Sequence, residues 1–212
     1  MLHYHTVPVT PFQQNCSVVW CDQTMDGAVI DPGGDLPMID RVIQRLNVQL
    51  KQILLTHGHI DHAGGAGRLA RERGLPVVGP HPGDQFWIDA LPVQAQFYGL
   101  DPAEPLSVSR WLGDGDTIAI GESVLAVRHC PGHTPGHVVF HSAEAQRAFV
   151  GDVLFAGSIG RTDFPGGDYD TLIESITKRL WPMGDDTVFI PGHGPESTFG
   201  RQRRSNPFVG GT

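Results

Sequence analysis

Three histidines and one aspartate lie within six residues, in the segment His57-Gly-His59-Ile-Asp61-His62. Neutral imidazole and carboxylate groups are ligands that Zn²⁺, Fe and Mn²⁺ accept, and no cysteine belongs to this cluster. The apolar run before it predicts a strand, and alternate side chains of a strand share a face, so we expect His57 and His59 to reach one ion. Asp61 and His62 follow where the chain changes direction, which suits a second ion. A metal site is therefore predicted, with a solvated histidine-rich turn as the alternative.

Three further candidate ligands each follow an apolar run. His133 lies in the motif CPGHTPGH of residues 130–137, whose two Pro-Gly pairs predict a rigid turn. His137 is the alternative ligand there, or a group that holds its neighbour in place. Asp152 follows residues 148–150, where a buried carboxylate is costly unless it meets a cation or hydrogen-bond donors. His193 lies in the motif PGHGP of residues 191–195. We therefore expect all the candidate ligands along one edge of the sheets.

The full set contains five histidines and two aspartates, enough for two ions that share one carboxylate. The histidines at positions 3, 5, 81, 129 and 141 lack such context and are interpreted as surface or core residues. Cys130 is interpreted as a small buried side chain.

The apolar runs predict an α/β protein with two stacked sheets and helices on both outer faces. Strands are expected over 2–9, 16–21 and 27–31, a helix over 36–46, a strand over 51–56, a helix over 61–73 and a strand over 76–79. Strands over 117–120, 123–129, 136–141 and 148–155, a helix over 169–180 and a strand over 187–190 repeat this order. Residues 84–99 fit a helix that Pro92 interrupts, or a loop or lid near the site.

The composition restricts the class of protein. The 212 residues, of which 40% are hydrophobic and 18% charged, fit one globular domain over 1–212. A net charge of −8 argues against a nucleic-acid or membrane partner. No apolar run approaches the ~18 residues of a membrane span, and the first residues do not resemble a signal peptide. The three cysteines fit a reducing compartment, so a cytoplasmic location is expected.

The HxHxDH motif of residues 57–62, together with His133, Asp152 and His193, resembles the metallo-β-lactamase superfamily over nearly the whole chain. The segments CPGHTPGH, GDVLF (151–155) and NPF (206–208) are similar to the hydroxyacylglutathione hydrolases, or type II glyoxalases. The similarity is to their short YcbL type, which lacks the helical C-terminal domain. This resemblance implies a four-layer αβ/βα sandwich.

The resemblance also implies the division of the ligands between two divalent ions, with zinc favoured and iron or manganese as alternatives. The first ion would be held by His57, His59 and His133, the second by Asp61, His62 and His193, and both by the bridging Asp152. Asp61 and Asp152 are implied as catalytic residues too. Arg161 is implied to hold a carboxylate of the substrate, and the alternative is a surface arginine paired with Asp163.

The implied reaction is hydrolysis of a small-molecule thioester, a glutathione conjugate such as S-lactoylglutathione, to D-lactate and glutathione. A hydroxide bridging the ions would be the nucleophile, since a metal lowers the pKa of bound water from ~15.7 to about 7. Such a reaction would belong to the detoxification of methylglyoxal. Residues 160–164 also resemble the persulfide dioxygenases of the same superfamily, which use one iron. That activity and a non-catalytic metal-binding module are the two alternatives.

Overall fold

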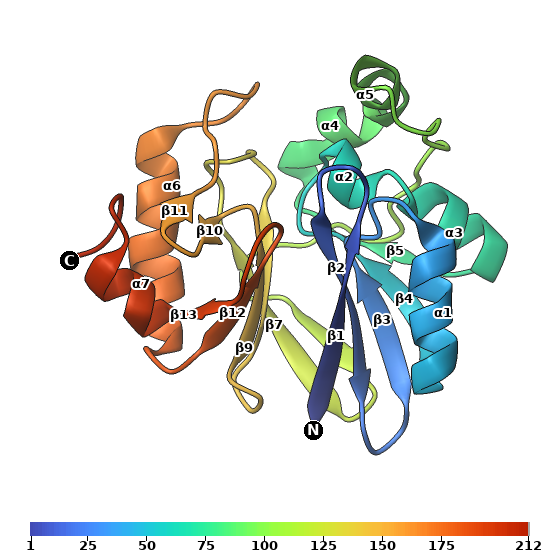
Figure 1. The fold of residues 1–212 in the computed structure, drawn as a ribbon, viewed down its shortest axis with the longest axis horizontal. Coiled ribbons are helices and arrows are strands. Elements are labelled where there is room, and N and C mark those ends of the chain that lie inside the picture. The colour runs from blue at the N-terminus through green and yellow to red at the C-terminus, as the bar shows by residue number, and fades with distance from the viewer. Residues whose placement is uncertain (212) are drawn as a thin grey trace.

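The computed structural model describes residues 1–211, which form two halves of similar element order (Figure 1). The first half contains strands β1 (Leu2–Val9), β2 (Gln14–Cys21), β3 (Asp26–Ile30), β4 (Gln49–Leu54) and β5 (Val77–Val78), and helices α1 (Leu36–Leu46), α2 (Ile60–Ala63), α3 (Ala66–Arg73), α4 (Gln85–Asp89) and α5 (Leu91–Tyr98). The second half contains β6 (Thr117–Ile120), β7 (Ser123–His129), β8 (Val138–Ser142), β9 (Arg147–Gly151), β10 (Leu154–Phe155), β11 (Ser158–Ile159), β12 (Val188–Pro191) and β13 (Ser197–Thr198), and helices α6 (Tyr169–Ser175) and α7 (Phe199–Ser205).

Two sheets face each other in the middle of the molecule. The five-stranded sheet has the order β1-β2-β3-β4-β5, and the six-stranded sheet has the order β13-β12-β9-β8-β7-β6. Helices α1 and α3 cover the outer face of the first sheet, and α6 and α7 cover that of the second (Figure 1). The predicted four-layer αβ/βα sandwich is therefore confirmed.

The central strands are apolar on both faces because each sheet is covered on both sides. In β2, Val18 packs in the cluster under α1 and α3, while Val19 packs between the sheets. In β8, Phe140 packs between the sheets, while Val139 packs in the cluster under α6 and α7. Successive side chains of a strand alternate between its faces. Continuous apolar runs are therefore what this layered core requires.

The strand directions bring the loops that carry the candidate ligands to one end of the molecule. Strands β3, β4 and β5 are parallel to one another, and β9 is parallel to β12. The loops after these strands consequently leave from their carboxyl ends, where α2 and the β10–β11 hairpin lie (Figure 1).

No helix within residues 1–211 combines the length and the apolar character needed to cross a bilayer.

The helix expected over 61–73 is instead two helices, α2 and α3, separated at Gly64 and Gly65. A β-carbon at Gly64 would collide with the carbonyl of Gly33, and one at Gly65 with the carbonyl of Pro32. The break therefore lets the loop after β3 contact this segment directly. Local periodicity could not reveal it, because the contact joins segments far apart in the chain.

Three further expectations need correction. The strand predicted over 148–155 ends at Gly151, whose φ of 49° is a left-handed conformation that glycine adopts readily. Pro92 does not interrupt a helix but lies in the first turn of α5, where proline's missing N–H is not needed. Strand β4 ends at Leu54, so His57 and His59 belong to the loop after it instead of to the strand itself.

Candidate metal centre

Three imidazoles converge at the end of β4 and in the loop between β7 and β8. The Nδ1 atom of His59 lies 3.1 Å from Nε2 of His57 and 3.0 Å from Nε2 of His133. Nitrogen ligands bind one ion at about 2.0–2.1 Å, which separates neighbouring ligand atoms by about 3.0–3.4 Å. The three predicted ligands of the first ion therefore have the spacing that a shared cation requires, although His57 and His59 do not lie on a strand.

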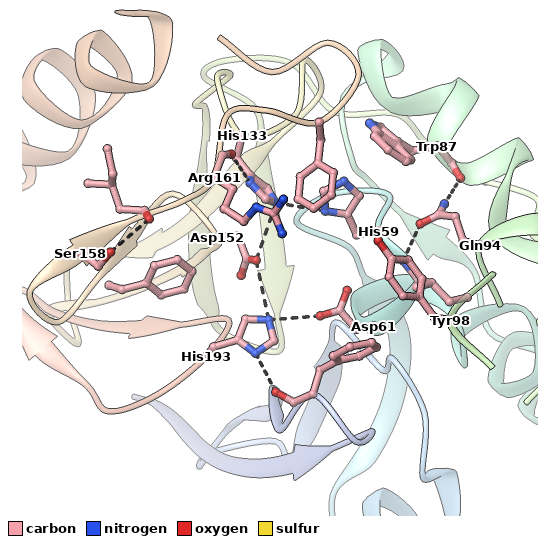
Figure 2. Close-up of a pocket in the computed structure, with 15 residues that line it drawn as sticks. His59, Asp61, Trp87, Gln94, Tyr98, His133, Asp152, Ser158, Arg161 and His193 are labelled. Carbon is pink, nitrogen blue, oxygen red and sulfur yellow. Dashed lines mark hydrogen bonds and ion pairs between the residues drawn. The ribbon is translucent and has the colours of Figure 1, made fainter. Parts of the chain in front are cut away.

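The predicted ligands of the second ion form a neighbouring group. The Nε2 atom of His193 lies 3.1 Å from Oδ2 of Asp61, and Nε2 of His62 lies 3.7 Å from the same oxygen. Figure 2 shows Asp61 and His193 facing each other across this group. The ligand atoms of the three residues all lie within 4.8 Å of one another.

Asp152 lies between the two groups, directly after β9. Its Oδ1 atom is 3.3 Å from Nε2 of His62, and its Oδ2 atom is 3.6 Å from Nε2 of His133. Oδ1 of Asp152 and Nε2 of His62 are both buried without a hydrogen bond. Because buried polar atoms are rarely left unpaired, these two atoms fit a cation between them. The positions of Asp152 and its neighbours thus suit the bridging role predicted from the sequence.

Carbonyl groups fix the orientation of two of the imidazoles. Nδ1 of His133 donates to the carbonyl oxygen of Arg161 at 2.7 Å, and Nδ1 of His193 donates to that of Phe12 at 3.1 Å. Since a carbonyl oxygen only accepts, the proton of each neutral ring lies on Nδ1. Each Nε2 atom then presents its lone pair to the centre, as a metal ligand must.

Residues 9–193 match the family described as the metallo-β-lactamase superfamily. The chain belongs to this superfamily. It is 45% identical to the hydroxyacylglutathione hydrolase GloC of Haemophilus influenzae over 209 residues, which cover 98% of both chains. The crystal structure of TTHA1623 in a di-iron-bound form has 38% identity and a TM-score of 0.87, over 97% of this chain and 100% of the other. The BLEG-1 B3 metallo-β-lactamase has 33% identity and a TM-score of 0.90, over 99% and 100%.

The similarity to a hydroxyacylglutathione hydrolase identifies the chain as a metallohydrolase of the glyoxalase II type, and its fold implies divalent metal binding. The protonation states of the histidines at the site are consistent with metal binding. Burial and the neighbouring His133 lower the pKa of His59 to about 3, so this ring is neutral and free to act as a ligand. Burial opposes protonation of His193 as well, yet the carboxylates of Asp61 and Asp152 outweigh it and raise the pKa of His193. The two carboxylates therefore favour positive charge at this position.

Asp31, which sequence reasoning missed, holds ligands of both groups. Its Oδ2 atom accepts hydrogen bonds from Nδ1 of His62 at 2.9 Å and from the hydroxyl of Thr56 at 2.6 Å. The Thr56 oxygen lies 3.0 Å from Nδ1 of His57, from which it can accept a hydrogen bond. Asp31 lies close enough to His57 and His62 to count as a ligand itself. However, it faces Nδ1 of His62, on the side of the ring away from the other ligand groups. The available signal was the one that identified Asp152, a carboxylate directly after an apolar strand.

Asp84 is a second residue that the sequence did not reveal. It is fully buried and accepts three hydrogen bonds, from the N–H of Gly58 at 2.9 Å, the hydroxyl of Thr134 at 2.8 Å and the N–H of Gly136 at 2.6 Å. Burial raises the pKa of Asp84 to about 6, although these three donors favour its ionised form. The carboxyl group thus ties the loop of His57 and His59 to the loop of His133.

His137, the alternative to His133 in its motif, lies outside both ligand groups. Its Nε2 atom accepts a hydrogen bond from the backbone N–H of Asp152 at 3.1 Å, and its ring stacks on His57 at 4.6 Å. Burial holds the pKa of His137 well below its usual value, so the ring is neutral. His137 therefore positions Asp152, which is close to the second role that the sequence allowed, although it holds a different neighbour from the one expected.

A cavity of about 440 Å³ opens onto the two ligand groups. Its lining outside the ligand set is mainly aromatic and aliphatic: Phe12, Ile60, Trp87, Gln94, Tyr98, Phe155, Ser158, Ile159, Arg161 and Phe164 (Figure 2). Residues 84–99, left open as a helix or a lid, contribute part of this wall through α4 and α5. A substrate seated in the cavity would therefore contact the carboxylates at its floor and apolar rings at its sides.

Arg161 lies at the exposed part of the cavity lining, and its guanidinium is engaged within the chain. It donates to both carboxylate oxygens of Asp163, at 2.9 and 2.7 Å, and lies 4.4 Å from the centroid of the Phe164 ring. The ion pair weighed as an alternative in the sequence is thus present. Arg161 also lines the cavity, where it could contact a substrate.

Proposed function

We propose that the chain hydrolyses a thioester of the S-lactoylglutathione kind, releasing D-lactate and glutathione. The observation that carries this proposal is the position of Asp152 at the floor of one cavity, with Oδ1 3.3 Å from Nε2 of His62 and Oδ2 3.6 Å from Nε2 of His133 and 3.7 Å from Nε2 of His193. The similarity to a hydroxyacylglutathione hydrolase supports the choice of a thioester. The proposed site binds two divalent ions, with zinc favoured over iron or manganese.

The ligands divide between the ions as their grouping implies. We assign His57, His59 and His133 to one ion, Asp61, His62 and His193 to the other, and Asp152 to both. When bound, such ions polarise a carbonyl group and lower the pKa of a water molecule to about 7. The aromatic walls restrict access of bulk water to the thioester. This restriction strengthens electrostatic contacts inside the cavity.

The carboxylates at the floor of the cavity handle the protons of the reaction. Asp61 lies on the cavity wall with Oδ2 3.1 Å from Nε2 of His193, where it can accept a proton from the attacking water. The water oxygen then bonds to the acyl carbon and the carbon–sulfur bond breaks. The thiolate of glutathione leaves and takes up the proton that Asp61 accepted, and the acyl group leaves as the carboxylic acid, whose new hydroxyl comes from the water.

We propose that Arg161 holds a carboxylate of glutathione. Arg161 and Asp163 are both solvent-exposed, and exposed ion pairs contribute little to stability. A substrate carboxylate can therefore replace Asp163 as the partner of the guanidinium without loss of a buried interaction.

The decisive experiment combines three measurements on one purified sample: metal content, loss of the S-lactoylglutathione thioester, and oxygen uptake with glutathione persulfide. The proposal expects about two ions per chain, thioester loss and no oxygen uptake. One iron per chain with oxygen consumption would instead identify a persulfide dioxygenase. A folded, metal-loaded protein without turnover would identify a metal-binding module.

A matched variant separates catalysis from folding. Asp61→Ala should abolish thioester loss while its circular dichroism spectrum stays that of the wild type, because Asp61 is partly exposed on the cavity wall and is not part of the core. Turnover that persists in Asp61→Ala would overturn its catalytic role.

A further inference from the structure

Aromatic rings flank the candidate metal centre on the side of His59. The ring of Trp87, in α4, lies 4.5 Å from the ring of His59 at an interplanar angle of 85°, and that of Phe164 lies 4.9 Å from it at 63°. The two aromatic rings are themselves perpendicular, with centroids 6.3 Å apart. A substrate group leaving the centre in this direction therefore meets ring edges and faces.

The side of His193 is aromatic as well. Phe12, in the β1–β2 turn, packs edge-to-face against Tyr98 of α5 at 5.6 Å, and Phe155 of β10 lies 6.3 Å from His193. Tyr98 and Asp61 both line this cavity (Figure 2). These rings come from three separate segments, so the apolar wall is a property of the cavity and not of one loop.

The polar side chains of the wall are largely engaged. Oε1 of Gln94 accepts from the N–H of Ile60 at 3.0 Å, and its Nε2 donates to the carbonyl of Trp87 at 2.8 Å. The hydroxyl of Ser158 donates to the carbonyl of Ile159 at 3.4 Å. The buried Nε1 of Trp87 remains a donor without a partner, whereas the rest of the wall presents mainly aromatic and aliphatic surface to an acyl group.

We infer that the cavity favours thioesters whose acyl group carries an aromatic ring over the small lactoyl thioester. This inference rests on the proposed function. The acyl and thiol arms of a thioester leave its carbonyl carbon in different directions, and both flanks of the centre are aromatic. The acyl arm therefore meets rings in either orientation of the substrate. A phenyl group there buries apolar surface and gains edge-to-face contacts that a methyl group cannot make.

The test compares S-mandeloylglutathione with S-lactoylglutathione. Both have the same thiol and the same 2-hydroxyl group, and differ by phenyl in place of methyl. The expected ratio of their kcat/KM values, after correction for the rates with hydroxide alone, is at least about ten in favour of mandeloyl, since even one methylene in an apolar pocket changes kcat/KM by about 10–200-fold. This ratio does not depend on metal loading, because both substrates report on the same active fraction.

Three variants locate the preference. Tyr98→Ala removes a ring on the His193 side, and Phe164→Ala removes one on the His59 side. One of the two should reduce the ratio at least about threefold, which would identify the acyl side. Val93→Ala is the matched control, because Val93 also lies in α5 but is 68% exposed and does not line the cavity. Its ratio should equal that of the wild type.

The outcomes separate this inference from the proposed function. Hydrolysis of both thioesters with a ratio near or below one overturns the aromatic preference and leaves thioester hydrolysis intact. A high ratio that neither Tyr98→Ala nor Phe164→Ala reduces overturns the assignment to these walls. Hydrolysis of neither thioester overturns the proposed function, and the inference with it.

Discussion

Asp31 does not line the cavity, and it lies on the side of the imidazole rings that is turned away from the cavity. It is nevertheless hydrogen-bonded, directly or through Thr56, to a ligand of each group. Its carboxylate accepts a hydrogen bond from Nδ1 of His62 and is connected to Nδ1 of His57 through the hydroxyl of Thr56. A carboxylate in this position fixes the tautomer of a ligating imidazole and increases its basicity. One buried side chain thus prepares a ligand for each of the two proposed ions.

Asp31→Asn should weaken metal binding about 10–100-fold, the usual effect of removing such a partner. The amide that replaces one carboxylate oxygen donates where Thr56 and His62 also donate, so at least one contact is lost. Competition with a chromogenic chelator measures the affinity. Asp26→Asn is the matched control, since it makes the same change on the preceding strand, where Asp26 pairs with the exposed Lys51. Equal losses in both variants would contradict the special role of Asp31.

The variant Asp152→Asn tests whether this residue is a ligand of both proposed ions. Because the carboxylate of Asp152 lies within 3.7 Å of ligands from both groups, replacing one of its oxygens by an amide nitrogen should reduce the occupancy of both ions together. Elemental analysis after dialysis should find the metal content falling from about two ions toward none. One ion still bound at full occupancy would show that Asp152 serves only one site.

At the scale of the elements, the short segment before α4 connects two ligand loops. Asp84 accepts hydrogen bonds from Gly58, between two of the proposed ligands, and from Thr134 and Gly136, which follow another. These three contacts serve the first ligand group and none of them reaches the second. We therefore expect this segment to affect the binding of the ion in the first ligand group more than that of the ion in the second.

Asp84→Asn should cost roughly 1–3 kcal/mol of unfolding free energy, because its amide leaves a buried donor without an acceptor. It should also release the ion of the first ligand group before that of the second. Metal titration followed by native mass spectrometry shows whether the two ions are lost one after the other or together. Asp89→Asn, at the exposed end of α4, should change neither the stability nor the order of metal release. Simultaneous loss of both ions would contradict a selective connection.

The ligand-bearing loops were predictable because each of them directly follows an apolar strand, and parallel strands end at a common edge. The positions of Asp31, Asp84 and His137 were not. Their roles depend on hydrogen bonds to residues between 15 and 52 positions away, which no local pattern records. The division of the helix after the first motif has the same origin, since Gly64 contacts the loop after β3.

At the scale of the whole molecule, the proposed ligands come from both sheets. His57, His59, Asp61 and His62 follow β4 of the first sheet, whereas Asp152 and His193 follow β9 and β12 of the second. An ion bound by residues of both halves stabilises their association, because it binds the folded chain and not the separated halves.

Removal of metal by a chelator should therefore lower the Tm. At a free ion concentration about 100 times the Kd, one site contributes about 2.7 kcal/mol to the unfolding free energy. Differential scanning calorimetry with and without chelator measures the loss, and readdition of metal should restore the Tm. The chelator should have little effect on Asp152→Asn, whose sites are already weakened. An unchanged Tm after complete metal removal would contradict ligation across the two sheets.

The origin of the ligands in both sheets has a consequence for how the protein matures. A chain in which only the first sheet has formed presents His57, His59, Asp61 and His62, but lacks the donors from the loops after β7, β9 and β12. Stable capture of both ions must therefore follow the assembly of both sheets. Chains that hold both ions have therefore completed both sheets, so the metal-loaded fraction of a freshly synthesised pool is a lower bound on the fraction that has folded.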